Sequence, residues 1–402
     1  MTHHLENARK RMKNIIWPTG HELILTDIVN ANNCELTDSG GNKYIDMESG
    51  VWCTSVGHCN PRINSVMTSQ IKKVIHTGFN YCNPVVDTAA RRVLEITNFP
   101  DGKCEFLCSG SEAVEFCVRA AKAIKPDAML LTFSDSYFGA YGEAARQDSK
   151  EWYRYNRHDC TCDTSGEGCC GECREFSEIP FDKIGIFLFE PGSSSGLVDF
   201  PSEKLIESIS KKIRENNGLI LINEVTTGAG RTGKWFGFQH YDLEPDMIAI
   251  GKGIGNGYPV SVAAISGKAA GLLENHHFHY SQSHQNDPLG ATVVNEVIAT
   301  ISDENLVERS RLLGEKIMTG LGSMKKTGSI LKEIRGRGLM IAIEFTGDAG
   351  LIQKELIKRG FIVAKRSGHE VLRIDPALTI REKDIDAFLY SLNEIVTDLN
   401  RR

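Results

Sequence analysis

The sequence predicts an α/β protein, in which a large domain has a mainly parallel sheet with helices on both faces and a smaller α+β domain follows it. Uninterrupted apolar runs, typical of strands buried on both faces, recur at 129–133, 184–189, 219–222 and 247–250. Amphipathic stretches such as 111–124 and 201–216 alternate with these runs. This alternation indicates parallel strands joined by helices.

The pattern changes after the last of these strands. A long helical pattern begins near Asn295, and behind it follow strand-like segments and a last helix, at 334–345, 361–364, 371–374 and from Arg381 onward. A chain of 402 residues, 41% of them hydrophobic, can bury one large and one smaller core. Three parts are therefore expected: an N-terminal segment (1–50) that packs on the small domain, a large domain (51–290) and a small C-terminal domain (291–402).

Composition argues against nucleic acid and membranes as partners. With 46 basic and 52 acidic residues the formal net charge is −6, and no basic block could neutralise a run of phosphates. No apolar stretch approaches a membrane span, and the polar N-terminus lacks the apolar core of a signal peptide. We expect the protein in the cytoplasm, where a reducing environment suits the cysteines scattered through its apolar segments.

One lysine is singled out by its surroundings. The segment DMIAIGKGIGNGYP at 246–259 carries Lys252 from an apolar strand into a glycine-rich loop. Glycines let the backbone approach a bound group closely, and an apolar setting lowers the pKa of an ammonium group, as an amine nucleophile requires. Taken alone, a surface lysine on a turn is the commoner explanation of such a segment.

Polar residues follow the strand at 219–222. Asn223 and Glu224 lie at its carboxyl end, where open parallel sheets bind ligands. Residues 228–233 also satisfy G-x-G-x-x-G, but they follow polar turn residues and no crossover helix is expected behind them. A dinucleotide site is therefore discounted.

The start of the helix at 111–124 is a candidate anion site. Ser-Gly-Ser-Glu at 109–112 places backbone N–H groups and hydroxyls there, so Gly110 and Ser111 are candidates to hold a phosphate. A helix cap completed by Glu112 explains the same residues, and the two explanations are compatible.

One segment does not fit a packed core. Residues 156–175 read NRHDCTCDTSGEGCCGECRE, with almost no large apolar side chains. Beside His158, the spacing predicts a structural zinc site with more than enough thiol ligands, from Cys160, Cys162, Cys169, Cys170 and Cys173. An iron–sulfur cluster, reduced thiols, local disulfides and a redox-regulated loop are the alternatives.

Together these segments resemble one family, the class III aminotransferases of the ω-amino acid and acetylornithine/ornithine type, with the fold-type-I fold of enzymes that use pyridoxal 5′-phosphate (PLP). The resemblance extends from about Leu23 to Leu399. Its motifs occur in the same order along the chain: GHCNPRI at 57–63, SGSEAVE at 109–115, SYFGAYGEA at 136–144, FEPGSSSG at 189–196, NEVTTGAGRTGKWFGFQHYDLEPD at 223–246, IGKGIGNGYPV at 250–260, NDPLGA at 286–291 and IRGRGLM at 334–340.

The resemblance implies that Lys252 binds PLP as an internal aldimine and then moves the proton between the substrate Cα and C4′ of the cofactor. Gly110 and Ser111 would hold the phosphate. Tyr137 would stack on the pyridine ring, with Phe138 where many members have histidine. Ser283 matches a threonine that reaches the phosphate from the neighbouring subunit, which implies a homodimer with shared active sites.

Further residues are implied around this centre. Arg373 resembles the arginine that grips a substrate carboxylate, and Trp52 falls in the segment that lines the substrate pocket. Glu190 and Val225 are counted with the cofactor-binding residues, Glu190 as a supporting carboxylate rather than an acid or base. Plainer alternatives are a core role for Tyr137 and Trp52 and a structural ion pair for Arg373.

The chain departs from the family at Asn223, where the family has an aspartate. That aspartate keeps the pyridine nitrogen protonated, so that the ring can take up the Cα carbanion as a quinonoid, and asparagine cannot supply its charge. Asparagine can accept a hydrogen bond from N–H or donate one to a bare nitrogen. Three explanations stay open: a transaminase with a weaker electron sink, a reaction such as racemisation, and loss of activity.

A second departure is Ser195, which replaces the glutamate that pairs with the carboxylate-binding arginine in ornithine and GABA aminotransferases. Without that partner, Arg373 stays available for a substrate carboxylate, which argues against close identity with those two activities.

The sequence thus predicts a dimeric PLP-dependent aminotransferase with Lys252 and Asn223 as catalytic residues. It would move an amino group from a small amino acid or amine to a keto acid or aldehyde. The alternatives are a PLP-dependent racemase, epimerase or aminomutase on the same fold, and a non-catalytic protein that senses metal through its cysteine-rich segment.

Overall fold

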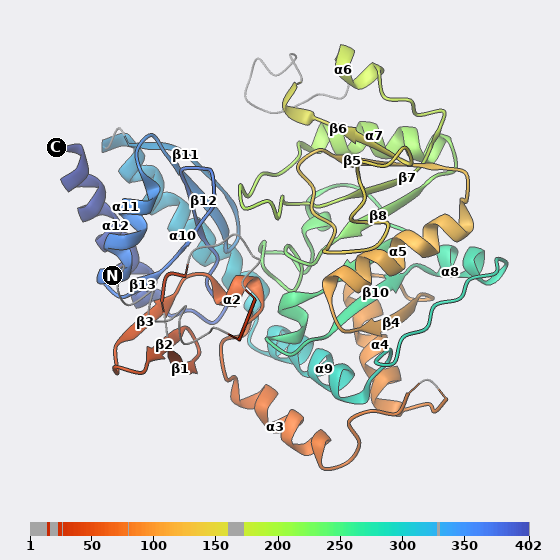
Figure 1. The fold of residues 1–402 in the computed structure, drawn as a ribbon, viewed down its shortest axis with the longest axis horizontal. Coiled ribbons are helices and arrows are strands. Elements are labelled where there is room, and N and C mark those ends of the chain that lie inside the picture. Colours follow the sequence, from red (N-terminus) through yellow and green to blue (C-terminus); the bar gives the residue numbers. More distant parts are fainter. Residues whose placement is uncertain are drawn as a thin grey trace.

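A large, mainly parallel sheet forms the centre of the right-hand part of the molecule in Figure 1. The computed structural model describes residues 14–16, 23–25, 27–78, 80–159, 173–327 and 330–401. The strand order is β4 (Lys103–Leu107), β10 (Ser261–Ile265), β9 (Met247–Ile250), β8 (Leu219–Asn223), β7 (Ile184–Phe189), β5 (Met129–Phe133) and β6 (Trp152–Tyr155). Of these described strands, β10 runs opposite to the other six, which all point in one direction. This mainly parallel sheet confirms the predicted fold class.

Both faces of this sheet are buried because successive side chains of a strand point to opposite faces. In β7, Ile186 and Leu188 pack in one core with helix α5 (Gly110–Ile124). Phe187 and Phe189 pack in the other core with α7 (Glu203–Glu215). Burial on both faces explains why the strands read as uninterrupted apolar runs.

Further helices cover the large sheet and its edge. Helix α8 (Gly267–Glu274) packs on α5, and α9 (Pro288–Asp303) packs on α3 (Pro61–Ile71) and α4 (Pro84–Thr97). Helix α9 also contacts the short helix η3 (Lys252–Gly255). The helical pattern expected near Asn295 therefore begins at Pro288, and the expected division after residue 290 falls inside this helix.

The remaining short helices are α2 (Ser49–Trp52), η1 (Arg157–Asp159), α6 (Arg174–Ser177) and η2 (Gly237–His240).

Two smaller sheets form the left-hand part of Figure 1. One joins the N-terminal strands to a C-terminal one, in the order β1 (Ile28–Asn32), β2 (Glu35–Asp38), β3 (Lys43–Asp46) and β13 (Phe361–Ile362). The other is antiparallel, in the order β11 (Leu331–Arg337), β12 (Met340–Phe345), β15 (Val371–Ile374) and β14 (Ala364–Lys365). The helices of this part are α10 (Leu306–Thr327), α11 (Ala349–Lys358) and α12 (Glu382–Asn400). N-terminal and C-terminal segments thus form one unit.

No helix in the described ranges has both the length and the apolar character that crossing a bilayer requires.

Helix α10 meets the loop between β11 and β12 at a pair of glycines. A Cβ on Gly314 would lie 2.2 Å from the carbonyl oxygen of Gly338, closer than atoms can approach. Gly338 has a φ of +54° and itself lies against the backbone of residues 231–233 of the large domain. Glycine at 314 is therefore required by close backbone packing.

Gly314→Ala is expected to lower the free energy of unfolding by about 2 kcal/mol, because the added methyl group overlaps a backbone that is itself packed. Gly322→Ala is the matched control in the same helix, since a Cβ there meets nothing within 4 Å. It should raise stability by up to about 1 kcal/mol through helix propensity. Chemical denaturation at one fixed protein concentration measures both, and a Gly314→Ala protein as stable as the parent would contradict the packing argument.

Candidate active site

Lys252 lies two residues after the end of strand β9 and has a strained backbone. Its φ is +45°, in the left-handed region that residues other than glycine rarely adopt. The preceding residue, Gly251, lies against the start of α5, because a Cβ there would be 3.1 Å from the Cα of Gly110. The fold therefore brings the lysine loop and the predicted phosphate-binding helix start into contact. Strain of this kind is concentrated at functional sites.

The side chain of Lys252 points into the protein. Its Nζ lies 5.1 Å from the centre of the Trp52 ring. Burial lowers the pKa of Lys252, and the nearby Cys53 and Glu190 act against this shift. A lowered pKa increases the fraction of neutral amine, which is the nucleophilic form.

Trp52 is carried by a left-handed turn. Ser49, Gly50, Val51 and Trp52 have φ values of 45°, 57°, 59° and 63°. This conformation costs roughly 1–2 kcal/mol for each residue other than glycine, so other contacts must hold it. The carboxylate of Asp46 does so by accepting the backbone N–H groups of Glu48 at 2.8 Å and Gly50 at 3.1 Å.

A buried arginine ties the same turn to the small domain. Arg231 is 1% exposed, and its Nη2 donates to the hydroxyl of Ser49 at 3.1 Å. The Ser49 hydroxyl in turn donates to the carbonyl oxygen of Asp375 at 2.6 Å. Arg231 Nη1 donates to the carbonyl oxygen of Leu339 at 3.0 Å. These bonds fix the turn that carries Trp52 relative to β15, the strand on which Arg373 lies.

Arg373 lies on β15, in the antiparallel sheet of the small domain, and its side chain contacts the Trp52 ring. Its guanidinium carbon is 3.8 Å from the ring centre. Its Nη2 is 3.4 Å from Oε1 of Glu48, and its Nε is 3.6 Å from Oδ2 of the buried Asp375. Burial raises the pKa of Glu48 to about 7, with Arg373 opposing the shift. Lys252 and Arg373 therefore share one aromatic neighbour, Trp52.

Tyr137, Glu190 and Asn223 form a closed set of hydrogen bonds, which we call the polar triangle. Nδ2 of Asn223 donates to the carbonyl oxygen of Tyr137 at 3.1 Å and to Oε1 of Glu190 at 3.3 Å. The backbone N–H of Tyr137 donates to Oε2 of Glu190 at 3.0 Å. Oδ1 of Asn223 accepts the backbone N–H of Val225 at 3.1 Å. Burial raises the pKa of Glu190 to about 7.

The start of α5 carries a helix cap, a glycine packed against Val225 and a serine hydroxyl that contacts a neighbouring loop. Ser109 and Glu112 form the reciprocal cap anticipated from the sequence. Gly110 is held against Val225, because a Cβ on it would be 2.7 Å from Val225 Cγ1. The hydroxyl of Ser111 accepts the backbone N–H of Ala140 at 3.2 Å, which places it beside the loop that carries Tyr137.

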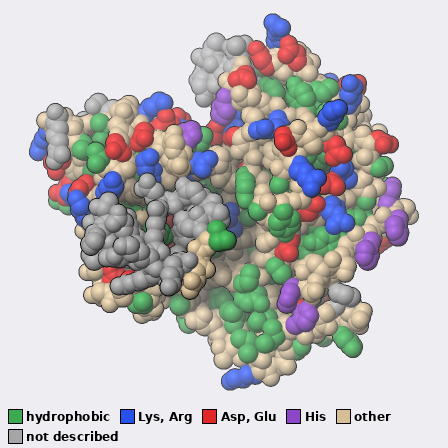
Figure 2. Space-filling model, viewed as in Figure 1, with side chains coloured by type: hydrophobic (Ala, Val, Ile, Leu, Met, Phe, Trp, Pro, Cys, Tyr) green, Lys and Arg blue, Asp and Glu red, His purple; other side chains and the backbone are tan. Residues whose placement is uncertain are grey.

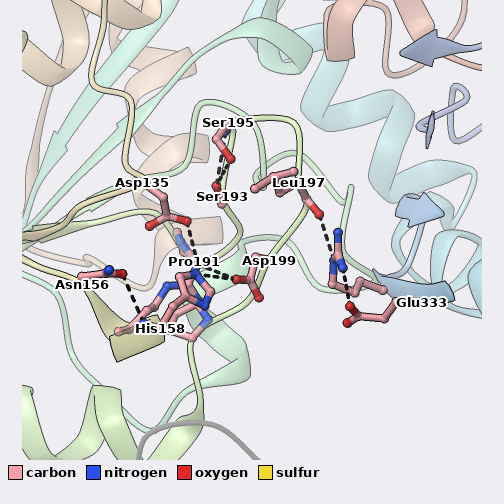
Figure 3. A network of polar contacts seen from close by, with 12 residues as sticks. Asp135, Asn156, His158, Pro191, Ser193, Ser195, Leu197, Asp199 and Glu333 are labelled. Carbon is pink, nitrogen blue, oxygen red and sulfur yellow. Dashed lines mark hydrogen bonds and ion pairs between the residues drawn. The ribbon is translucent and has the colours of Figure 1, made fainter. Parts of the chain in front are cut away.

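Phe138, Ser283 and Ser195, which the sequence analysis also singled out, lie apart from the polar contacts described above. Phe138 is buried and stacks on Trp152 at 5.9 Å between ring centres. Ser283 is exposed in the loop between α8 and α9. Figure 3 shows Ser195 turned toward Ser193, with the two hydroxyl oxygens 2.6 Å apart.

The cysteine-rich segment falls largely outside the described residues, as do Cys160, Cys162, Cys169 and Cys170. Cys173 is described: it is buried, and its Sγ lies 3.9 Å from the Tyr155 hydroxyl. His158 pairs with Asp199 at 3.1 Å in the network of Figure 3, and this contact raises its pKa. The zinc site stays a prediction.

Sequence reasoning missed Glu48 and Asp375, the two carboxylates beside Arg373. Asp375 follows Arg373 closely in VLRIDPAL, so its position after a strand was a usable signal. Glu48 gave no such signal, because it reaches Arg373 across 325 positions of the chain.

The chemistry of these residues fits PLP, the cofactor implied by the resemblance. The site offers a buried amine of lowered pKa for an aldehyde and a helix start with backbone N–H groups for a phosphate. The polar triangle supplies a hydrogen-bonding side chain next to the lysine, since β8, which ends at Asn223, is the neighbour of β9.

Comparisons with known proteins agree with this chemistry. The family model for class-III aminotransferases matches residues 16–396. A leucine/methionine racemase of Thermococcus litoralis is 27% identical over 405 residues, covering 92% of this chain and 90% of the racemase. An acetylornithine aminotransferase of Caldanaerobacter subterraneus is 28% identical over 380 residues, covering 92% of this chain and 95% of the relative. The crystal structure of an S-selective transaminase from Bacillus megaterium superposes with a TM-score of 0.88 at 20% identity, covering 98% of both chains.

Proposed function

The chain belongs to the class-III aminotransferase family and is a PLP-dependent transaminase, and within that function we propose that Lys252 is the residue that binds the cofactor. The observation that carries the proposal is the position of the Lys252 amine. It belongs to a half-buried side chain beside Trp52, on a loop that touches the helix start at Gly110.

When bound, PLP supplies an aldehyde that takes up the amino group and a ring that withdraws electrons from the adjoining carbon. Lys252 Nζ has two roles: it holds the aldehyde carbon in the resting protein, and it accepts and returns the proton of the substrate Cα. Burial supports both roles, because it lowers the pKa of Lys252 and so increases the fraction of neutral amine.

We propose that Gly110 and Ser111 bind the phosphate and that Tyr137 orients the ring. The free N–H groups at the start of α5 favour an anion. Glu190 and Asn223 hydrogen-bond to the backbone N–H and carbonyl oxygen of Tyr137, which fixes the backbone from which its ring extends. Val225 packs on Gly110 and closes the space behind the helix start.

Borohydride treatment of the holoprotein should fix the cofactor on Lys252 alone, as read by peptide mass spectrometry. Lys252→Arg should abolish both the fixed cofactor and transamination, because a guanidinium does not condense with the aldehyde. Lys103→Arg, at an exposed lysine paired with Glu274, should change neither. Fixation on another lysine would contradict the assignment. Inversion of the amino donor without amination of the cofactor would instead support racemisation, the activity of the Thermococcus relative.

We further propose that the amino donor is a small amino acid whose carboxylate binds Arg373. Arg373 and Lys252 both lie beside the Trp52 ring, which brings the carboxylate-binding candidate close to the amine. Ser195 stands where related enzymes have a glutamate, and its hydroxyl contacts Ser193. The competitor in this chain is Glu48, which a substrate carboxylate must displace from Nη2.

Glu48→Gln should lower the KM of carboxylate-bearing donors by about fivefold with little change in kcat, because an ion pair of about 1 kcal/mol no longer competes. Amine donors without a carboxylate serve as the internal control, and their KM should not fall. In the parent protein the KM of carboxylate donors should fall as the pH drops through about 7, where Glu48 becomes protonated. A KM that is unchanged by the substitution for both donor classes would contradict this role of Glu48.

We propose that the protein is a homodimer with shared active sites. Large hydrophobic side chains are exposed at the end of α3, on the loop after it and on the loop of Tyr137, namely Ile71, Ile75, Tyr81, Tyr137 and Tyr141. Figure 2 shows hydrophobic side chains gathered low in the view, where Figure 1 places α3 and α9. Burial of these groups would stabilise a dimer. The exposed Ser283 would then reach the phosphate of the other subunit.

Mixing two inactive variants tests the shared site. Lys252→Ala removes the amine, and Ser283→Asp places a negative charge against the phosphate. If these residues come from different subunits, unfolding and refolding the two variants together should restore up to about a quarter of the parent activity, since half of the dimers are mixed and each has one intact site. Each variant refolded alone is the control, and no recovery in a mixture shown to contain mixed dimers would contradict the proposal.

Two further proposals rest on the cysteines. Seven of the described cysteines are free thiols, which supports a reducing location such as the cytoplasm: Cys34, Cys53, Cys59, Cys82, Cys104, Cys108 and Cys117. A structural zinc at residues 160–173 is supported by the spacing of the thiols alone.

A further inference from the structure

The amide of Asn223 has no hydrogen-bond donor left. An asparagine Nδ2 carries two N–H bonds, and here they point to the carbonyl oxygen of Tyr137 and to Oε1 of Glu190. The amide cannot be turned over, because Oδ1 would then face two acceptors and Nδ2 would face the Val225 N–H. What remains is one free lone pair on Oδ1.

This count decides between two roles open to an asparagine that contacts the cofactor. With Oδ1 alone available, Asn223 can accept a hydrogen bond from a protonated ring nitrogen. It cannot donate one to a bare nitrogen without breaking the polar triangle and leaving a buried acceptor unpaired, which is unfavourable because the acceptor has already lost its contact with water.

The negative charge missing from residue 223 is present one hydrogen bond away, on Glu190. Both of its carboxylate oxygens accept N–H groups, from Tyr137 and from Asn223, and acceptance by both oxygens favours the ionised form. Lys252 and Asp135 are the other charged groups that act on it. A cation hydrogen-bonded to Asn223 would hold the carboxyl ionised more strongly still.

We propose that Asn223 and Glu190 together replace the aspartate of the family: Asn223 accepts the hydrogen bond of the protonated pyridine nitrogen, and Glu190 supplies the compensating charge through the amide. The proposal rests on PLP being bound at Lys252. Asn223 is the residue in contact, and Glu190 is a positioning residue that acts through it. The substitution at 223 therefore moves the counter-charge outward by one hydrogen bond, and the transaminase keeps its electron sink.

Glu224 provides a matched control beside this pair. It is fully buried, and burial raises its pKa to about 7, as for Glu190. Its carboxylate, however, accepts from Thr227 at 2.6 Å and from the backbone N–H groups of Gly237 and Phe238 at 2.9 and 2.7 Å. Glu224→Gln removes one buried carboxylate, as Glu190→Gln does, but leaves the polar triangle intact.

The experiment is nitrogen NMR on the holoprotein reconstituted with PLP that carries ¹⁵N in its ring, since protonation shifts this resonance far upfield. The parent protein and Glu224→Gln should show the protonated resonance. Glu190→Gln should lose it, and Asn223→Ala, which removes the acceptor but keeps Glu190, should lose it too. The double variant Asn223→Asp/Glu190→Gln should regain it, because the aspartate supplies the charge directly.

An unprotonated resonance in the parent protein would overturn the proposal. So would a protonated resonance that persists in Glu190→Gln, or in Asn223→Ala if Glu190→Gln does not fold. Failure of the underlying assignment looks different, because the labelled cofactor would then stay unbound and borohydride would fix nothing on Lys252.

Discussion

Burial of both faces of the large sheet is the constraint on which the site depends. A strand covered on both sides has no room for a charged side chain along its length, so polar residues collect where the strands end. Glu190, Asn223 and Lys252 each stand at the carboxyl end of a strand, on the neighbours β7, β8 and β9. The same rule that makes the strands apolar therefore gathers the reactive groups at one edge.

The smaller part of the molecule completes this edge from outside. Trp52 comes from a left-handed turn held by Asp46 and Arg231, and Arg373 comes from β15. Their contact brings an aromatic ring and a guanidinium group close to the lysine. The strain in this turn is retained because the hydrogen bonds of buried groups offset it. A site assembled from distant segments in this way depends on the packing of the whole chain.

Electrostatic balance at the site follows from paired groups. Glu48 and Asp375 flank Arg373, while Glu190 lies behind Asn223. Burial raises the pKa of Glu48 and Glu190 to about 7, and the cation or donors beside each carboxylate oppose that rise. Asn223 illustrates the point, because replacing a charged residue left the local hydrogen-bond network complete and shifted the charge to a neighbour.

The sequence by itself determined the fold class, the family and the importance of Lys252, because apolar runs, glycine-rich loops and motif order are local features of the chain. Even the helix cap at Ser109 and Glu112 could be anticipated, since its partners are three residues apart. Only the tertiary structure decided that Glu48 opposes Arg373 and that Glu190 uses the donors of Asn223. The contact between Glu48 and Arg373 joins residues that are 325 positions apart, and the contact between Glu190 and Asn223 joins residues that are 33 positions apart. No local pattern of the sequence encodes which distant carboxylate the packing brings to a given cation or amide.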